Sequence, residues 1–203
     1  NYANHFVFLF LGGFMIALAM EKWNFHKRLA LWIITLIGTG LNRIVLGFMT
    51  AAAFLSMWIS NTATTMMLLP VGMAVVRQVA EQSTLDGRCD EITKGQVAES
   101  LGLVLMLGLA YSASIGGVGT LIGTAPNIVF AGFYKKLYPE NPEISFVEWM
   151  VMAIPIVILF IPIVWIYLCR FVAPISLNRI EFAKDNGDII TNELSALGKI
   201  TRP

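Results

Sequence analysis

Three consecutive uncharged polar residues, Ser60, Asn61 and Thr62, lie in the middle of an apolar stretch that runs from Ile44 to Val76. Their hydroxyl and amide oxygens, with backbone carbonyls freed at a turn, are the hard ligands that a dehydrated alkali cation needs. Ser56 precedes Ser60 by four residues, so on a helix it lies one turn back on the same face. The spacing therefore predicts a cation site that includes Ser56, Ser60 and Asn61.

The same polar turn can hold an anion. The N-terminus of a helix has free N–H groups and the positive end of the helix dipole, so an anionic group can bind there without a lysine or an arginine. A structural interpretation stays open for each hydroxyl, because Ser and Thr in membrane helices often bond to the carbonyl four residues earlier or to a neighbouring helix. Asn61, inside so dense a polar cluster, is harder to explain in that way.

A second unusual segment, from Gly116 to Asn127, contains four glycines and Pro126. With the small residues that begin at Tyr111, these residues are expected to unwind the helix. The segment lacks the G-x-x-x-x-G-K-[ST] pattern of a phosphate-binding loop, and close helix packing through small residues is the alternative explanation. Two interrupted, polar-centred spans in one chain favour a transporter site.

The residues give little support for a proton relay, an enzyme or a cysteine metal site. No carboxylate lies in the apolar ranges 44–76 and 100–134, which disfavours a proton relay built on Asp or Glu. These ranges also lack a pair of nucleophile and base or a metal-binding triad, so we expect no catalytic residues and no enzyme. Cys89 and Cys169 lack metal-ligand spacing, and both are interpreted as structural.

The composition indicates that a lipid bilayer surrounds these residues. Of the 203 residues, 57% are hydrophobic and 13% charged, and the mean hydropathy is +0.72, which is typical of a protein in a lipid bilayer. The net charge of +1 gives no field that would attract a nucleic acid. The sequence therefore predicts an all-α polytopic membrane protein with no nucleic-acid partner.

The stretch from Ile44 to Val76 is too long for one ordinary span and is polar in its middle. Two half-length helices that meet at Ser60–Thr62 would explain both facts, because backbone can leave the helix at membrane depth only where protein or a water-filled cavity shields it. We therefore expect a re-entrant helical hairpin, followed by a discontinuous transmembrane helix from Ser100 to Tyr134. The range 146–172 is a more regular span, in which Pro155 and Pro162 predict bends.

The predicted organisation has six segments. These are membrane and interfacial helices of a scaffold (1–43), the re-entrant hairpin (44–77), a cytoplasmic loop or surface helix (78–99), the discontinuous helix (100–134), a transmembrane helix (146–173), and a cytoplasmic amphipathic helix and linker (174–203). Twelve of the 14 Lys and Arg residues lie on the side of the hairpin's mouth, and only Lys135 and Lys136 lie opposite. By the positive-inside rule the mouth is cytoplasmic.

The chain resembles the first half of the divalent anion/sodium symporters, which carry succinate, citrate and related dicarboxylates. The resemblance covers most of the chain up to about Val172 and is carried by three segments: FLSMWISNTATTMMLLPV, IGGVGTLIGTAPN and FLGGFMIALAMEKWNFHKRLAL. It implies one half of an inverted repeat, a homodimer in a bacterial inner membrane, and an elevator-type motion of a transport domain against a scaffold.

The resemblance also implies roles for individual residues. The cation would be sodium, bound by Ser56, Ser60, Asn61 and a carbonyl near Gly119, with Gly117 as a neighbour. A substrate carboxylate would contact Asn61 and Thr62. The family has a second repeat with its own hairpin and sodium site, so we expect this chain to be part of a longer protein and unable to transport alone.

Alternatives stay open at this point. The chain could serve a sulfate or other oxyanion transporter, or a proton-coupled carboxylate carrier, on a related scaffold. From other classes, it could be a membrane-embedded enzyme or an assembly subunit that does not transport. Loss of ion binding on replacement of Asn61, as opposed to loss of stability alone, would separate a transporter site from a packing role.

Overall fold

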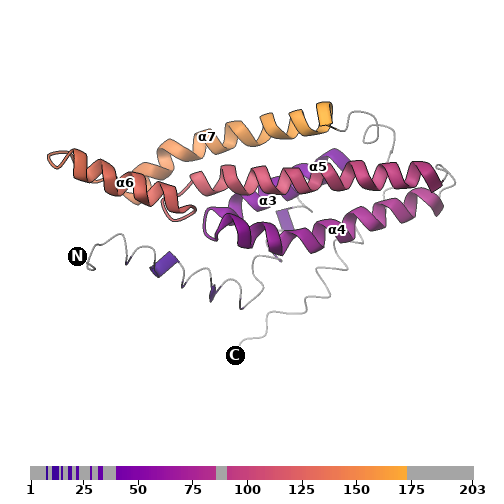
Figure 1. The fold of residues 1–203 in the computed structure, drawn as a ribbon, viewed down its shortest axis with the longest axis horizontal. Coiled ribbons are helices and arrows are strands. Elements are labelled where there is room, and N and C mark those ends of the chain that lie inside the picture. Colours follow the sequence, from indigo (N-terminus) through magenta and orange to yellow (C-terminus); the bar gives the residue numbers. More distant parts are fainter. Residues whose placement is uncertain are drawn as a thin grey trace.

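The structure is a computed structural model that describes residues 40–85 and 91–172 and scattered positions between residues 8 and 33 (Figure 1). Within these residues the chain forms helices and no strand. The elements are α3 (Leu41–Ser56), α4 (Asn61–Leu85), α5 (Glu91–Val118), α6 (Ala125–Leu137), α7 (Phe146–Tyr167) and the π-helical turn η1 (Leu168–Val172).

Three helical segments are long and apolar enough to cross a membrane: Asn61–Glu81, Ala98–Val118 and Phe146–Val172. They confirm the predicted fold class, an all-α polytopic membrane protein. Most of the predicted scaffold helices in 1–43, and the amphipathic segment 174–203, lie outside the described residues.

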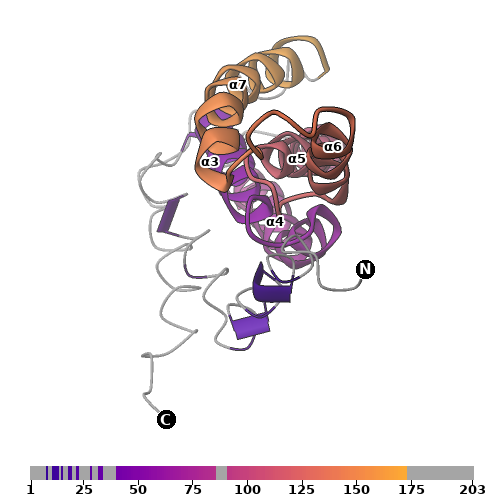
Figure 2. The ribbon, with the colours of Figure 1, turned by 90° about the vertical axis from the view of Figure 1, so that its left-hand side faces the viewer.

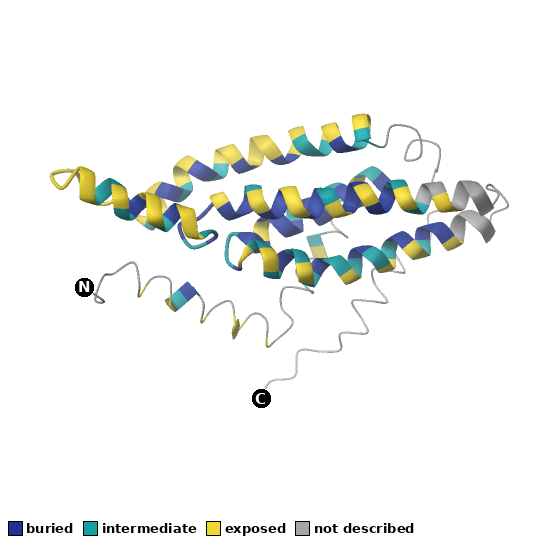
Figure 3. Ribbon diagram, in the orientation of Figure 1, coloured by how far each residue is buried: buried dark blue, intermediate teal, exposed yellow. Residues whose placement is uncertain are grey.

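The centre of the fold is α5, which packs against both α3 and α4. Viewed end-on, α3 lies between α7 and α4, with α5 beside it (Figure 2). Buried residues recur along α5 every three or four positions, as a helix with partners on two sides requires (Figure 3). These residues are Leu101, Gly102, Val104, Leu105, Gly108, Leu109, Ser112, Ala113, Gly116 and Gly117.

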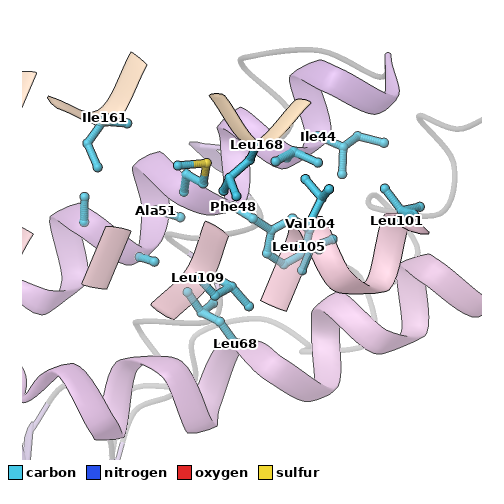
Figure 4. Packing of buried hydrophobic residues seen from close by; sticks show 14 of the residues in the cluster. Ile44, Phe48, Ala51, Leu68, Leu101, Val104, Leu105, Leu109, Ile161 and Leu168 are labelled. Atoms are coloured by element: carbon cyan, nitrogen blue, oxygen red, sulfur yellow. The ribbon is translucent and has the colours of Figure 1, made fainter. Parts of the chain in front are cut away.

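Glycines determine how closely α4 approaches α5. A methyl group added at Gly72 of α4 would come within 2.5 Å of Leu105 Cδ2, and one added at Gly102 would lie 3.8 Å from Val76. The two helices are therefore antiparallel, and Leu68 and Leu109 meet in the core between them (Figure 4). This register brings the first residue of α4 opposite the last turn of α5.

Helix α7 is tied to the rest of the fold by two indoles. Trp149 Nε1 donates to the carbonyl of Val118 at the end of α5 (2.9 Å), and Trp165 Nε1 donates to the carbonyl of Asn42 at the start of α3 (2.8 Å). The first turn of α7 carries a capping box, in which Ser145 Oγ accepts from Glu148 N and Glu148 Oε2 accepts from Ser145 N.

Two details differ from the sequence-based expectation. The predicted loss of helix from Tyr111 onwards is wrong as far as Val118, because α5 continues to that residue. Its last glycines serve close helix packing, and an intact helix bonds its own backbone groups in an apolar surrounding. Both hairpin helices were predicted to be half as long as a membrane span. Helix α3, with 16 residues, fits this prediction, but α4, with 25 residues, does not.

Candidate functional site

The link between α3 and α4 is only four residues long, Met57–Ser60. The last turn of α3 tightens there, since Trp58 N and Ile59 N both donate to Leu55 O at 3.0 Å. Ser60 then begins α4 as its N-terminal cap, with Ser60 Oγ accepting from Ala63 N at 3.3 Å. The chain therefore reverses at the polar cluster singled out from the sequence, where α3 and α4 meet (Figure 1).

Two of the predicted cation ligands are in direct contact at this turn. Ser56 Oγ donates to Asn61 Oδ1 at 2.5 Å, and Ser56 is completely buried while Asn61 is half-buried. Ser60 and Thr62 are exposed at the tip. A hydroxyl that donates one hydrogen bond keeps two lone pairs, and an amide oxygen that accepts one keeps another. Both oxygens can therefore still bind a cation.

Gly117 lies directly against this pair. A methyl group added at Gly117 would overlap with Asn61 Oδ1 and would lie close to Asn61 Nδ2. Among the amino acids, only glycine leaves room for the Asn61 amide at this point of α5. The structure therefore brings Gly117 together with Ser56 and Asn61.

The break between α5 and α6, Gly119–Thr124, contacts the hairpin tip through Thr120. Thr120 Oγ1 donates to Met57 O at 2.5 Å and accepts from Gly123 N at 3.0 Å. A Cβ placed on Gly123 would lie 3.0 Å from Ser56 O, so the backbones of the two segments are in van der Waals contact. One buried hydroxyl thus joins the hairpin to the break.

Several backbone carbonyls at the end of α5 and in the break accept hydrogen bonds. The carbonyl of Gly116 accepts from Gly119 N (2.8 Å), that of Gly117 from Asn127 Nδ2 (3.0 Å), that of Val118 from Trp149 Nε1 (2.9 Å) and that of Thr120 from Asn127 Nδ2 (2.7 Å). Within the described residues, the carbonyls of Gly119, Leu121, Ile122 and Gly123 have no donor. Gly119 also lies against Met57, since a Cβ there would be 3.0 Å from Met57 Cε.

Thr120 and Asn127 are the residues that sequence reasoning missed. Both lie in the glycine-rich segment, and both are buried, with 0% and 6% of their surfaces exposed. A signal was present, because a polar side chain within an apolar span must find hydrogen-bond partners inside the protein. The positions of those partners, however, depend on the break itself.

Comparison with known proteins gives the family. A family model described as "Citrate transporter" matches residues 1–199. The chain belongs to this family. The family predicted from the Ser60–Thr62 motif and its neighbours is therefore confirmed.

Two curated relatives are similar along almost the whole chain. The sodium-dependent dicarboxylate transporter SdcS of Staphylococcus saprophyticus is 43% identical over 200 residues, which are 98% of this chain and 36% of that protein. SdcS of Staphylococcus aureus strain NCTC 8325 is 41% identical with the same coverage. The chain thus spans about a third of the length of the curated relatives that it matches.

Replacing Thr120 with valine tests the link between hairpin and break. Valine leaves Met57 O without its donor and leaves Gly123 N only the backbone carbonyl of residue 120 at 3.4 Å, which is expected to lower the free energy of unfolding by about 1–3 kcal/mol. Serine at the same position keeps the hydroxyl and should retain most of the stability. Thermal unfolding of the three purified proteins measures the difference. A valine variant as stable as the wild type would show that the two hydrogen bonds contribute nothing.

Proposed function

We propose that this chain supplies one sodium site and part of the substrate site of a sodium-coupled dicarboxylate transporter. The observation that carries the proposal is the contact of Ser56 with Asn61, together with Gly119, which lies against Met57 of the same turn and whose carbonyl has no donor within the described residues. These neutral oxygens form the kind of ligand set that a dehydrated sodium ion needs, with Ser60 as a further ligand at the tip. The names of the two SdcS relatives support sodium as the ion and a dicarboxylate as the substrate.

One side chain can couple the ion to the substrate. Asn61 Oδ1 faces Ser56, so its oxygen end is the end available to the cation. The Nδ2 end is a donor and can bind a substrate carboxylate, together with the exposed hydroxyl of Thr62. A bound sodium would hold the Asn61 amide in one orientation and so present Nδ2 to the substrate. We therefore expect sodium to bind before the dicarboxylate.

The hairpin formed by α3 and α4 is proposed to be re-entrant, with its tip inside the membrane. Helix α3 has 16 residues, about 24 Å at 1.5 Å per residue, which is shorter than the hydrocarbon core of about 30 Å. The shared core of α3, α4 and α5 supports an elevator-type motion, in which tip and break move together with ion and substrate. The proposed assembly is a homodimer in the bacterial plasma membrane.

Thermal unfolding of the complete product of the gene, with and without sodium and succinate, tests this function. A ligand present at 100 times its Kd stabilises by about 2.7 kcal/mol, so sodium should raise the unfolding temperature and succinate should raise it further only when sodium is present. Asn61→Ala should lose both effects. Parallel titrations with citrate and sulfate measure the substrate class.

The matched control is Asn141→Ala, which removes an exposed amide bonded to the hydroxyl of Tyr134, far along the chain from the hairpin. This variant should respond to sodium and succinate as the wild type does. Equal responses to lithium, potassium and sodium, with Asn61→Ala responding like the wild type, would contradict the proposed sodium site.

A further inference from the structure

The side chain of Asn127, in the first turn of α6, is enclosed by carbonyl groups. Its Nδ2 lies 2.7 Å from Thr120 O, 3.0 Å from Gly117 O and 3.5 Å from Val118 O, and the residue is 6% exposed. Carbonyl oxygens only accept hydrogen bonds, so the end of the amide that faces three of them must be the NH₂ group. Chemistry thereby decides the orientation of the amide.

The two N–H groups of Asn127 can serve two of these carbonyls fully. They serve Thr120 and Gly117 at the shorter distances, while Val118 receives its own donor from Trp149 at 2.9 Å. Without the Asn127 amide, the Gly117 carbonyl would lose its donor, and the Thr120 carbonyl would keep only Gly123 N at 3.4 Å. Each buried acceptor left unpaired costs about 1–3 kcal/mol, so the backbone would change its path.

The hydrogen bonds of Asn127 also affect the neighbouring carbonyl of Gly119. Asn127 holds Gly117 O and Thr120 O on either side of Gly119, and the hydroxyl of Thr120 is fixed at the same time on Met57 O. The peptide groups around Gly119 are therefore held at both ends. Among the described residues, the Gly119 carbonyl between these two fixed carbonyls has no donor, and Gly119 lies against Met57 of the hairpin turn.

We infer that Asn127 is a positioning residue for the cation: it fixes the break so that the Gly119 carbonyl, and not its neighbours, completes the site. This inference rests on the proposed sodium site and adds to it a residue that does not touch the ion. Loss of a partner that orients a metal ligand typically lowers metal affinity about 10- to 100-fold. Selectivity among alkali cations should change as well, because a displaced carbonyl alters the size of the site.

The experiment compares Asn127→Ala and Asn127→Ser with wild type in the complete protein. Sodium and lithium are titrated separately, and the readouts are the unfolding temperature and the rate of succinate uptake at each concentration. We expect the half-saturating sodium concentration to rise about 10- to 100-fold in Asn127→Ala, and less in Asn127→Ser, which retains one donor. Excess sodium should restore much of the uptake rate, and the ratio of sodium to lithium affinity should change.

A purely structural role would give a different result. It would lower the unfolding temperature without sodium and leave both the half-saturating sodium concentration and the sodium-to-lithium ratio as in the wild type. That result overturns the inference. Uptake by cells that express the variants gives the same sodium dependence without purification, so a variant that is unstable in detergent is still tested.

The controls separate this inference from the proposed function. Asn141→Ser, at an exposed asparagine, should show wild-type titrations. If the wild type itself shows no sodium dependence, the proposed function fails. If the wild type responds to sodium and both Asn127 variants titrate as it does, the proposed function stands and only the positioning role fails.

Discussion

Alanine at Gly117 is expected to weaken sodium binding more than about tenfold while the helices stay folded. The added methyl group would occupy the place of Asn61 Oδ1, which is the far end of a side chain and can rotate away. The backbones of α4 and α5 would not have to separate, so the free energy of unfolding without sodium should fall by only about 1 kcal/mol. Rotation of the amide, however, would remove Asn61 from Ser56 and from the proposed ion.

Sodium titrations of the unfolding temperature measure this effect. We expect the half-saturating concentration to rise more than about tenfold in Gly117→Ala, as for other changes that misplace a metal ligand. The control is Gly132→Ala in α6, where an added methyl group meets no atom within 4 Å. A Gly117→Ala variant with wild-type sodium affinity would show that the position of the Asn61 amide does not matter for the ion.

One residue earlier, the same substitution should prevent folding. A methyl group at Gly116 would overlap with the carbonyl and Cα of Ala53, which are backbone atoms of α3. No side chain can rotate to relieve this overlap, so α3 and α5 would have to move apart and open the core that contains Phe48, Met49 and Leu109. We expect a loss above the usual 1–3 kcal/mol of overpacking, roughly 4 kcal/mol or more.

The yield of monodisperse protein and its unfolding temperature measure this loss along a graded series. Gly108→Ala should be intermediate, since its methyl group would lie 3.1 Å from Met49 Cγ and a methionine can adjust. Gly132→Ala should be neutral or slightly stabilising, because alanine favours the helix. Equal stability of Gly116→Ala and Gly132→Ala would contradict the close contact between α3 and α5.

The sequence was most informative where polar residues interrupt apolar ones. Ser60, Asn61 and Thr62 predicted a turn, because no regular transmembrane helix explains such a cluster. The structure has the turn slightly earlier, at Met57–Ser60, and Asn61 and Thr62 begin α4. The second interruption was recognised, but its start was placed too early. Glycine suits both helix breaks and close helix packing, and sequence alone does not say which applies. The structure shows that close packing applies here, because Gly116 lies against Ala53 and Gly117 lies against Asn61.

Contacts between distant segments could not be predicted. Thr120 bonds to Met57 and Asn127 to Gly117 only because the break folds back on the hairpin and on its own preceding helix. Neither partner lies at a helical spacing that a periodicity argument would find. The residue types and spacing predicted a cation site of Ser56, Ser60 and Asn61, and the resemblance to a family added sodium as the ion. These roles stay predictions until ion binding is measured.

The two indole contacts of α7 have a mechanical consequence. Trp149 and Trp165 are 16 positions apart, about 24 Å along the helix axis. Trp149 is hydrogen-bonded to the end of α5, and Trp165 is hydrogen-bonded to the start of α3. A helix held by one hydrogen bond can rotate about that contact or shift by one turn. A helix held by two distant hydrogen bonds can do neither without breaking one of them. A rearrangement that shifts Val118 relative to Asn42 must therefore break an indole hydrogen bond or bend α7, and a motion that keeps both bonds displaces α3, α5 and α7 as one piece.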